Sequence, residues 1–113
     1  MSKRRTNIRT RTRKLREAIA AMDYVAAGAV SARMKLCGRP NCACARDPAA
    51  RHGPYHEWHR YQDGRLAHRT LTAEQAAILA GAVANFREIQ RLLVRWEEET
   101  VTDVLDRPKS GTR

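Results

Sequence analysis

The chain has 113 residues, enough for one modest domain, and such a domain buries only about two-thirds of the surface of its unfolded chain. Hydrophobic residues make up 42% of the sequence, which excludes a wholly disordered protein, but aromatic residues make up only 5%. The expected core is therefore thin and mostly aliphatic. The sequence has neither an apolar run of about 18 residues nor a signal-peptide pattern, so we expect a soluble, cytoplasmic protein with no membrane partner.

Positive charge is concentrated in the first part of the chain. Residues 1–72 contain 16 Lys or Arg against 5 Asp or Glu, whereas residues 73–113 contain 6 against 7. Arginine outnumbers lysine by 18 to 4, and its planar guanidinium group suits phosphates and guanine edges. This distribution predicts a polyanionic partner, namely nucleic acid.

The first predicted elements are an arm and a helix. Residues 1–11 are polar and basic without hydrophobic periodicity, which predicts a disordered arm. From Thr12 onward, apolar residues follow the i, i+4, i+7, i+11 spacing of one helix face, and Gly28 is the expected stop signal. The residues of this face are Leu15, Ile19, Met22 and Ala26.

A small antiparallel sheet is expected next. Apolar and polar residues alternate over residues 30–36, which is the period of a half-buried strand. Residues 41–54 contain prolines and a glycine and are predicted to form a loop. Residues 55–61 and 65–71 are two further predicted strands, joined by a hairpin at Gln62-Asp63-Gly64 because Asp-Gly tolerates positive φ.

A long helix is expected to follow the sheet. Thr72 and Gln75 match a capping box at its start, and an apolar residue then recurs every three or four positions as far as Val104. The recurring residues are Leu79, Val83, Phe86, Ile89, Leu93 and Trp96. A rod of about 45 Å is longer than the sheet can cover. We therefore expect its distal half to pair with another chain, as in a homodimer, or with the N-terminal helix, and residues 106–113 to form a flexible tail.

All three cysteines lie within eight residues, Cys37, Cys42 and Cys44, where a disulfide framework spanning the fold cannot be built. Three thiolates and one imidazole make the closed tetrahedral set of a structural zinc site, so zinc is the expected cofactor. The spacing matches none of the common zinc-finger patterns, which leaves the fourth ligand open. The candidates are His52 first, His56 second, and His59 or His68 from the hairpin.

Two other interpretations concern the predicted hairpin. Tyr55, Trp58 and Tyr61 lie on or beside one strand and are able to stack on bases, although for Trp58 we favour packing against the long helix. Carboxylates are scarce between residues 37 and 71, which argues against a metal-dependent nuclease. They are Asp47, Glu57 and Asp63. We therefore expect no catalytic site.

The segment from Gly28 to Trp96 resembles a family of small prokaryotic proteins of unknown function, often encoded beside transposases or in mobile elements. The resemblance is carried by CGRPNCAC at Cys37–Cys44 and HGPY at His52–Tyr55. It implies a cysteine-rich knuckle, a β-hairpin and a long helix. It also implies DNA rather than RNA as the nucleic acid, and an accessory role in a mobile genetic element.

The sequence thus predicts an α+β fold in one domain over residues 12–105, with a three-stranded sheet, a zinc knuckle, an N-terminal helix and a long C-terminal helix. The predicted function is non-enzymatic nucleic-acid binding. The arginines expected to contact it are Arg4, Arg5, Arg9, Arg11, Arg13, Arg16, Arg33, Arg39, Arg46, Arg51, Arg60, Arg65 and Arg69. The alternative is an adaptor or assembly subunit that binds an acidic protein partner, such as a transposase, through the sheet or the long helix.

Overall fold

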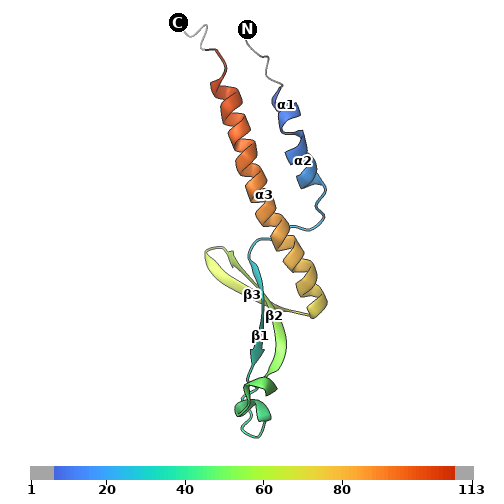
Figure 1. Cartoon of the computed structure of the whole chain (residues 1–113). Helices are drawn as coiled ribbons and strands as arrows, with labels where there is room; N and C mark the ends of the chain where they lie inside the picture. Colours follow the sequence, from blue (N-terminus) through green and yellow to red (C-terminus); the bar gives the residue numbers. More distant parts are fainter. Residues whose placement is uncertain (1–6, 109–113) are drawn as a thin grey trace. The chain divides into compact units, whose positions relative to one another are not determined.

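The computed structural model describes residues 7–108 and has the predicted α+β class. Short N-terminal helices precede a three-stranded antiparallel sheet and a long C-terminal helix (Figure 1). Contacts divide the chain into a helical unit, Met1–Asp23 with Phe86–Arg113, and a sheet unit, Tyr24–Asn85. No helix of the described residues is long and apolar enough to cross a membrane.

The helical unit begins with α1 (Ile8–Arg11). Oδ1 of Asn7 accepts hydrogen bonds from the backbone N–H groups of Arg9 and Thr10, at 2.8 and 3.3 Å. The sequence predicts an unordered arm over residues 1–11, and the part of it from Ile8 onward is instead a helical turn. The cause is the Asn7 cap, which supplies an acceptor for otherwise unpaired donors. Residues 1–6, including Arg4 and Arg5, lie outside the described residues.

Helix α2 (Arg13–Ala20) and the C-terminal half of α3 (Ala73–Leu105) complete the helical unit. The buried side chains are Thr12, Leu15 and Leu92. Nε of Arg11 lies 2.7 Å from Oε1 of Glu99. This unit therefore has a thin core supplemented by an ion pair.

Helix α2 ends at Ala20, short of the predicted end near Ala26. The backbone N–H of Ala26 donates to the carbonyl of Ala82, at 3.1 Å, within the sheet unit. Nδ2 of Asn85 likewise donates to the carbonyl of Tyr24 at 2.9 Å. These tertiary hydrogen bonds hold residues 24–27 out of helical conformation. The apolar residues that were predicted to form one helix face therefore lie in two units, Leu15 and Ile19 in the helical unit and Ala26 in the sheet unit.

The sheet has the order β1-β2-β3, with β1 (Ala29–Lys35), β2 (His52–Gln62) and β3 (Arg65–Leu71). Asp63 and Gly64 have φ values of 54° and 77°, and Gln62 pairs with Arg65. The predicted hairpin is thus a two-residue turn with both central residues in the left-handed region.

Strand β2 begins at His52, three residues before the predicted start, so His52-Gly53-Pro54 is strand rather than loop. Strand β3 reaches only as far as the pair His56–Leu71, which leaves residues 52–55 paired with β1 alone. Pro54 lacks a backbone N–H, which is tolerated where one side of a strand has no partner. Gly53 has φ 133°, and a Cβ there would lie 2.9 Å from the Arg33 carbonyl oxygen.

The predicted capping box starts α3. Oγ1 of Thr72 accepts from the Gln75 backbone N–H at 3.0 Å, and Oε1 of Gln75 accepts from the Thr72 N–H at 2.9 Å. Trp58 lines one hollow with Ile78 and Leu79 of α3, and its Nε1 donates to the Ala27 carbonyl at 2.8 Å. Trp58 is therefore turned toward α3, as expected from the sequence.

Candidate metal centre

The cysteines lie in the connection between β1 and β2. Residues 37–52, which comprise most of this connection and the first residue of β2, are here called the knuckle. Gly38 has φ 82°, which lets the chain turn directly after Cys37. The Cys42 backbone N–H donates to the Arg39 carbonyl at 3.2 Å, with Pro40 in the second position of the turn, where its fixed φ is favourable. Cys37 and Cys42 are thereby brought to one side of the loop.

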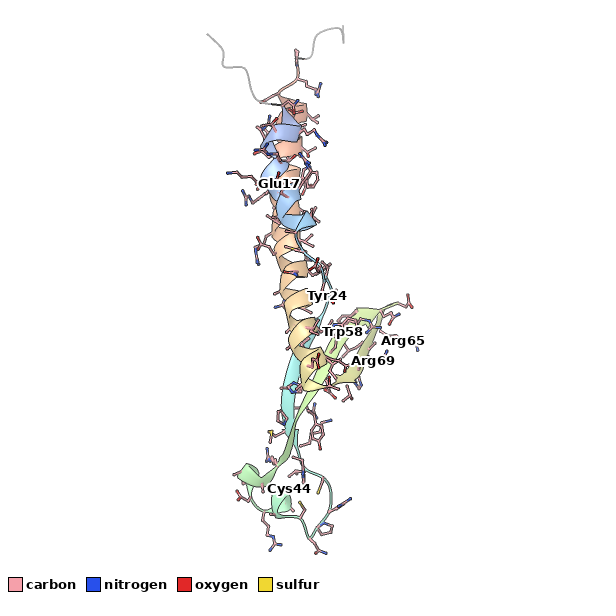
Figure 2. The ribbon with its side chains drawn as sticks, turned by 90° about the vertical axis from the view of Figure 1, so that its right-hand side faces the viewer. Glu17, Tyr24, Cys44, Trp58, Arg65 and Arg69 are labelled. Carbon is pink, nitrogen blue, oxygen red and sulfur yellow. The ribbon has the colours of Figure 1, made fainter. Side chains whose placement is uncertain are left out.

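Two short 3₁₀ turns return the chain to the sheet. They are η1 (Ala43–Ala45), which contains Cys44, and η2 (Pro48–Ala50). Oδ1 of Asp47 caps η2 by accepting from the Ala49 N–H at 3.0 Å. His52 follows as the first residue of β2, opposite Lys35. Figure 2 shows Cys44 in this loop, beyond the ends of the two strands.

Four side chains converge in the knuckle. The ligand atoms of Cys37, Cys42, Cys44 and His52 all lie within 4.8 Å of one another. The two sulfur atoms of Cys37 and Cys44 are 3.5 Å apart, and Sγ of Cys42 is 3.2 Å from Nε2 of His52. A tetrahedral zinc ion with ordinary bond lengths requires about 3.8 Å between sulfurs and about 3.6 Å between sulfur and nitrogen. The four residues are placed to hold a metal ion.

The thiols of the knuckle differ in acidity. Hydrogen bonds from the Cys44 backbone N–H and from the His52 ring lower the pKa of Cys42 to about 6. For Cys44, the Cys37 backbone N–H lowers the pKa, but burial and the neighbouring thiols outweigh it and raise the pKa overall. Cys42 is therefore more readily available as a thiolate than Cys44.

The other three histidines lie on the sheet, outside this group. His56 pairs with Ala32 and Leu71. Nε2 of His59 lies 3.1 Å from Oγ of Ser31, and the ring centroids of His59 and His68 are 5.9 Å apart. His52 is thus the histidine that the fold brings to the cysteines.

The predicted nucleic-acid-binding arginines occupy three kinds of position. Arg11 is ion-paired with Glu99, and Arg60 stacks on the Trp58 ring, 4.1 Å from its centroid. Arg16 is half-buried and lines a hollow with Arg9 and Arg13 in the helical unit. The exposed arginines are Arg9, Arg13, Arg33, Arg39, Arg46, Arg51, Arg65 and Arg69.

The structure has a hollow beside the knuckle that the sequence did not predict. Its polar and aromatic lining is Arg39, Asn41 and Tyr55, and the remaining lining residues are Pro40 and three of the four candidate metal ligands. Nζ of Lys35 lies 5.1 Å from the centroid of the Tyr55 ring. Asn41 lies inside the CGRPNCAC motif, and the sequence predicts only a loop for it. The hollow forms because the chain returns at His52 to a position beside Asn41, which the sequence pattern does not indicate.

Residues 5–80 match the model of a family described as "Domain of unknown function (DUF6788)". No curated protein and no solved structure matches the chain.

Proposed function

The chain belongs to this family of unknown function, and we propose that it is a nucleic-acid-binding protein, stabilised by zinc and without catalytic activity. Zinc is favoured because three thiolates and one imidazole are a common ligand set of structural zinc sites. The four ligand atoms within 4.8 Å of one another support this assignment. Bound metal would tie the end of β1 to the start of β2.

A structural role fits the ligand set better than a catalytic one. Four protein ligands complete a tetrahedral shell, which leaves no open position for water or substrate. The Glu57 carboxylate, in the middle of β2, is buried and lies 3.7 Å from Nζ of Lys35 and 3.5 Å from Nε2 of His59. These contacts suit a structural carboxylate rather than a ligand of a second metal ion.

The observation that carries nucleic-acid binding is the row of Arg9, Arg13 and Arg16 in the helical unit, here called the arginine row. The three residues follow i, i+4, i+7 spacing and line one hollow with Asn7. The Arg13 side chain is 64% exposed, and its Nε lies 3.7 Å from Oε2 of Glu17. The Arg16 guanidinium is held in place by donating to the Arg9 carbonyl at 2.6 Å. Such a row presents several guanidinium groups to successive phosphates.

The sheet unit also carries an excess of positive charge. Residues 24–85 contain eight Lys or Arg against four Asp or Glu, a net charge of +4. Three of these cations, Arg39, Arg46 and Arg51, are exposed on the knuckle. DNA rather than RNA, and an accessory role with a transposase or another mobile-element protein, are included in the proposal on the strength of the resemblance carried by the CGRPNCAC and HGPY motifs.

Charge substitutions in the helical unit test the function. The variant Arg9→Gln/Arg13→Gln/Arg16→Gln removes the arginine row. The control Arg87→Gln/Arg91→Gln/Arg95→Gln removes the same charge from exposed positions of α3. Binding of labelled duplex and single-stranded DNA, followed by fluorescence anisotropy over a salt series, should weaken strongly for the first variant and slightly for the control. Equal losses would mean that only net charge matters, and the absence of binding by the unaltered protein would refute the function.

A second candidate role, assembly through α3, is favoured by one observation. Leu93, Val94, Val101, Val104 and Leu105 are 46–75% exposed. At about 100° per residue, Val94 and Val101 lie about 180° around the helix from buried Leu92. We propose that this face, here called the α3 stripe, pairs with a second copy of the chain, because burying it would enlarge a core that has only three buried side chains among the described residues of the helical unit.

A further inference from the structure

We propose that the hollow beside the knuckle binds an unpaired base of single-stranded nucleic acid, an inference that rests on the proposed nucleic-acid function. Three of its lining side chains suit a base: Tyr55 for stacking, and Arg39 and Asn41 for hydrogen bonding. The remaining lining residues belong to the metal centre or adjoin it, which places the hollow on a rigid loop whenever metal is bound.

Tyr55 supplies the stacking surface. The residue is 40% exposed, at the part of β2 that pairs with β1 alone. Arg33 lies directly opposite it in the ladder, and Nζ of Lys35 lies 5.1 Å from its ring centroid. An exposed aromatic ring flanked by cations is the arrangement by which proteins hold a stacked base and its neighbouring phosphates.

Asn41 and Arg39 supply the hydrogen-bonding groups. An asparagine amide both donates and accepts, and a guanidinium group donates in a planar fork, so together they match the edge of a base. Within residues 7–108 neither side chain has a hydrogen-bonding partner. A duplex hides its bases' pairing edges and faces, so the hollow selects unpaired bases.

Tyr61 is a matched control on the same strand. It is 78% exposed, but it lies opposite Leu66 at the hairpin end, about 20 Å along β2 from Tyr55. It does not line the hollow beside the knuckle.

The test compares an oligothymidine of about 12 nucleotides with the thymidine–adenosine duplex of the same length, by fluorescence anisotropy with the zinc-loaded full chain. Tyr55→Ala should weaken binding of the single strand about tenfold and leave duplex binding within about twofold. Tyr55→Phe, which keeps the ring, and Tyr61→Ala should both bind the single strand like the unaltered protein. Zinc content and melting temperature establish that each variant is folded.

Asn41→Ala gives an independent reading, because an exposed turn residue is replaced without altering the strand. This variant too should bind the single strand more weakly while binding the duplex like the unaltered protein. The proposed base site is overturned if Tyr55→Ala and Asn41→Ala both bind the single strand like the unaltered protein. It is also overturned if Tyr61→Ala loses as much affinity for the single strand, or if the two variants lose as much affinity for the duplex. If the unaltered protein binds neither nucleic acid, the proposed function fails and the base site fails with it. If it binds both but the hollow variants behave as the unaltered protein does, only the base site fails.

Discussion

Sγ of Cys42 lies 3.2 Å from Nε2 of His52, although the two residues are ten positions apart in the sequence. Cys42 ends the turn that begins at Arg39, and His52 begins β2. The contact joins the tip of the loop to the sheet. A metal ion bound at this point would restrict the loop in the folded state and would contribute its binding free energy to folding.

Metal removal should therefore strongly lower the stability of the knuckle. We expect one zinc ion per chain by elemental analysis, and a large drop in melting temperature after chelation, since structural zinc contributes on the order of 10 kcal/mol in zinc-finger peptides. Cys44→Ser should act like chelation because Cys44 is the buried ligand. His56→Ala is the control and should keep its zinc. A metal-free protein that melts at the temperature of the loaded one would contradict a structural zinc site.

In the metal-free protein, kept below its reduced melting temperature so that the knuckle stays folded, Cys42 should react faster than Cys44 at neutral pH. Its pKa is lowered to about 6 by hydrogen bonds from the Cys44 backbone and His52, so at pH 7 it is mostly thiolate, the nucleophilic form. Because the folded pKa lies below the unfolded one, this group's contribution to stability is complete above the unfolded pKa of about 9 and is lost as pH falls through about 6.

Alkylation by iodoacetamide, located by peptide mass spectrometry at a series of pH values, measures this acidity. The rate at Cys42 should rise with a midpoint near pH 6, and His52→Ala should move the midpoint upward. A midpoint near the ordinary thiol value in the unaltered protein would show that the hydrogen bonds to Cys42 do not form.

Gly28 should be intolerant of a side chain. It has φ 100°, and a Cβ there would lie 2.1 Å from the His59 carbonyl oxygen and 3.0 Å from Nε1 of Trp58. We expect Gly28→Ala to lower the free energy of unfolding by about 2–4 kcal/mol in urea denaturation. Gly81→Ala, in open space on α3, should instead raise it by about 0.5–1 kcal/mol. Equal effects of the two substitutions would be inconsistent with the close packing of Gly28 against His59 and Trp58 of β2.

The α3 stripe should make the protein dimeric. Light scattering of the unaltered chain should give twice the 12.8 kDa monomer mass, and Val101→Asp should return it to the monomer mass. Thr102→Asp places the same charge on the next, exposed residue, about 100° away around the helix, and should leave the dimer intact. A monomer at every concentration for the unaltered chain would rule out a homodimer and leave the stripe to a different partner.

The elements that could be predicted from the sequence are those that local chemistry decides. Asp63-Gly64 and the Thr72–Gln75 capping box each act within a few residues, and the structure has both. The end of α2 could not be predicted, because Ala26 is held by a hydrogen bond to Ala82, far along the sequence. Gly28 was expected only to stop a helix, whereas its position is fixed by close approach to β2.

The candidate metal site was predictable for the same reason. Three cysteines within eight residues indicate a metal centre without knowledge of the fold, whereas the choice among four histidines depends on where β2 begins. The arginine predictions depended still more on tertiary structure. Arg11 and Arg60 look like free cations in the sequence, but Glu99 and Trp58 engage them.

The salt dependence of nucleic-acid affinity tests the central claim most directly. Each phosphate neutralised on a duplex contributes about 0.9 to the slope of log affinity against log salt, so the arginine row alone should give a slope of about −2.7. We predict that slope or a steeper one for the unaltered, zinc-loaded chain in anisotropy titrations with duplex DNA. No binding even at about 50 mM salt, or binding with a flat slope, would contradict a function based on phosphate contacts.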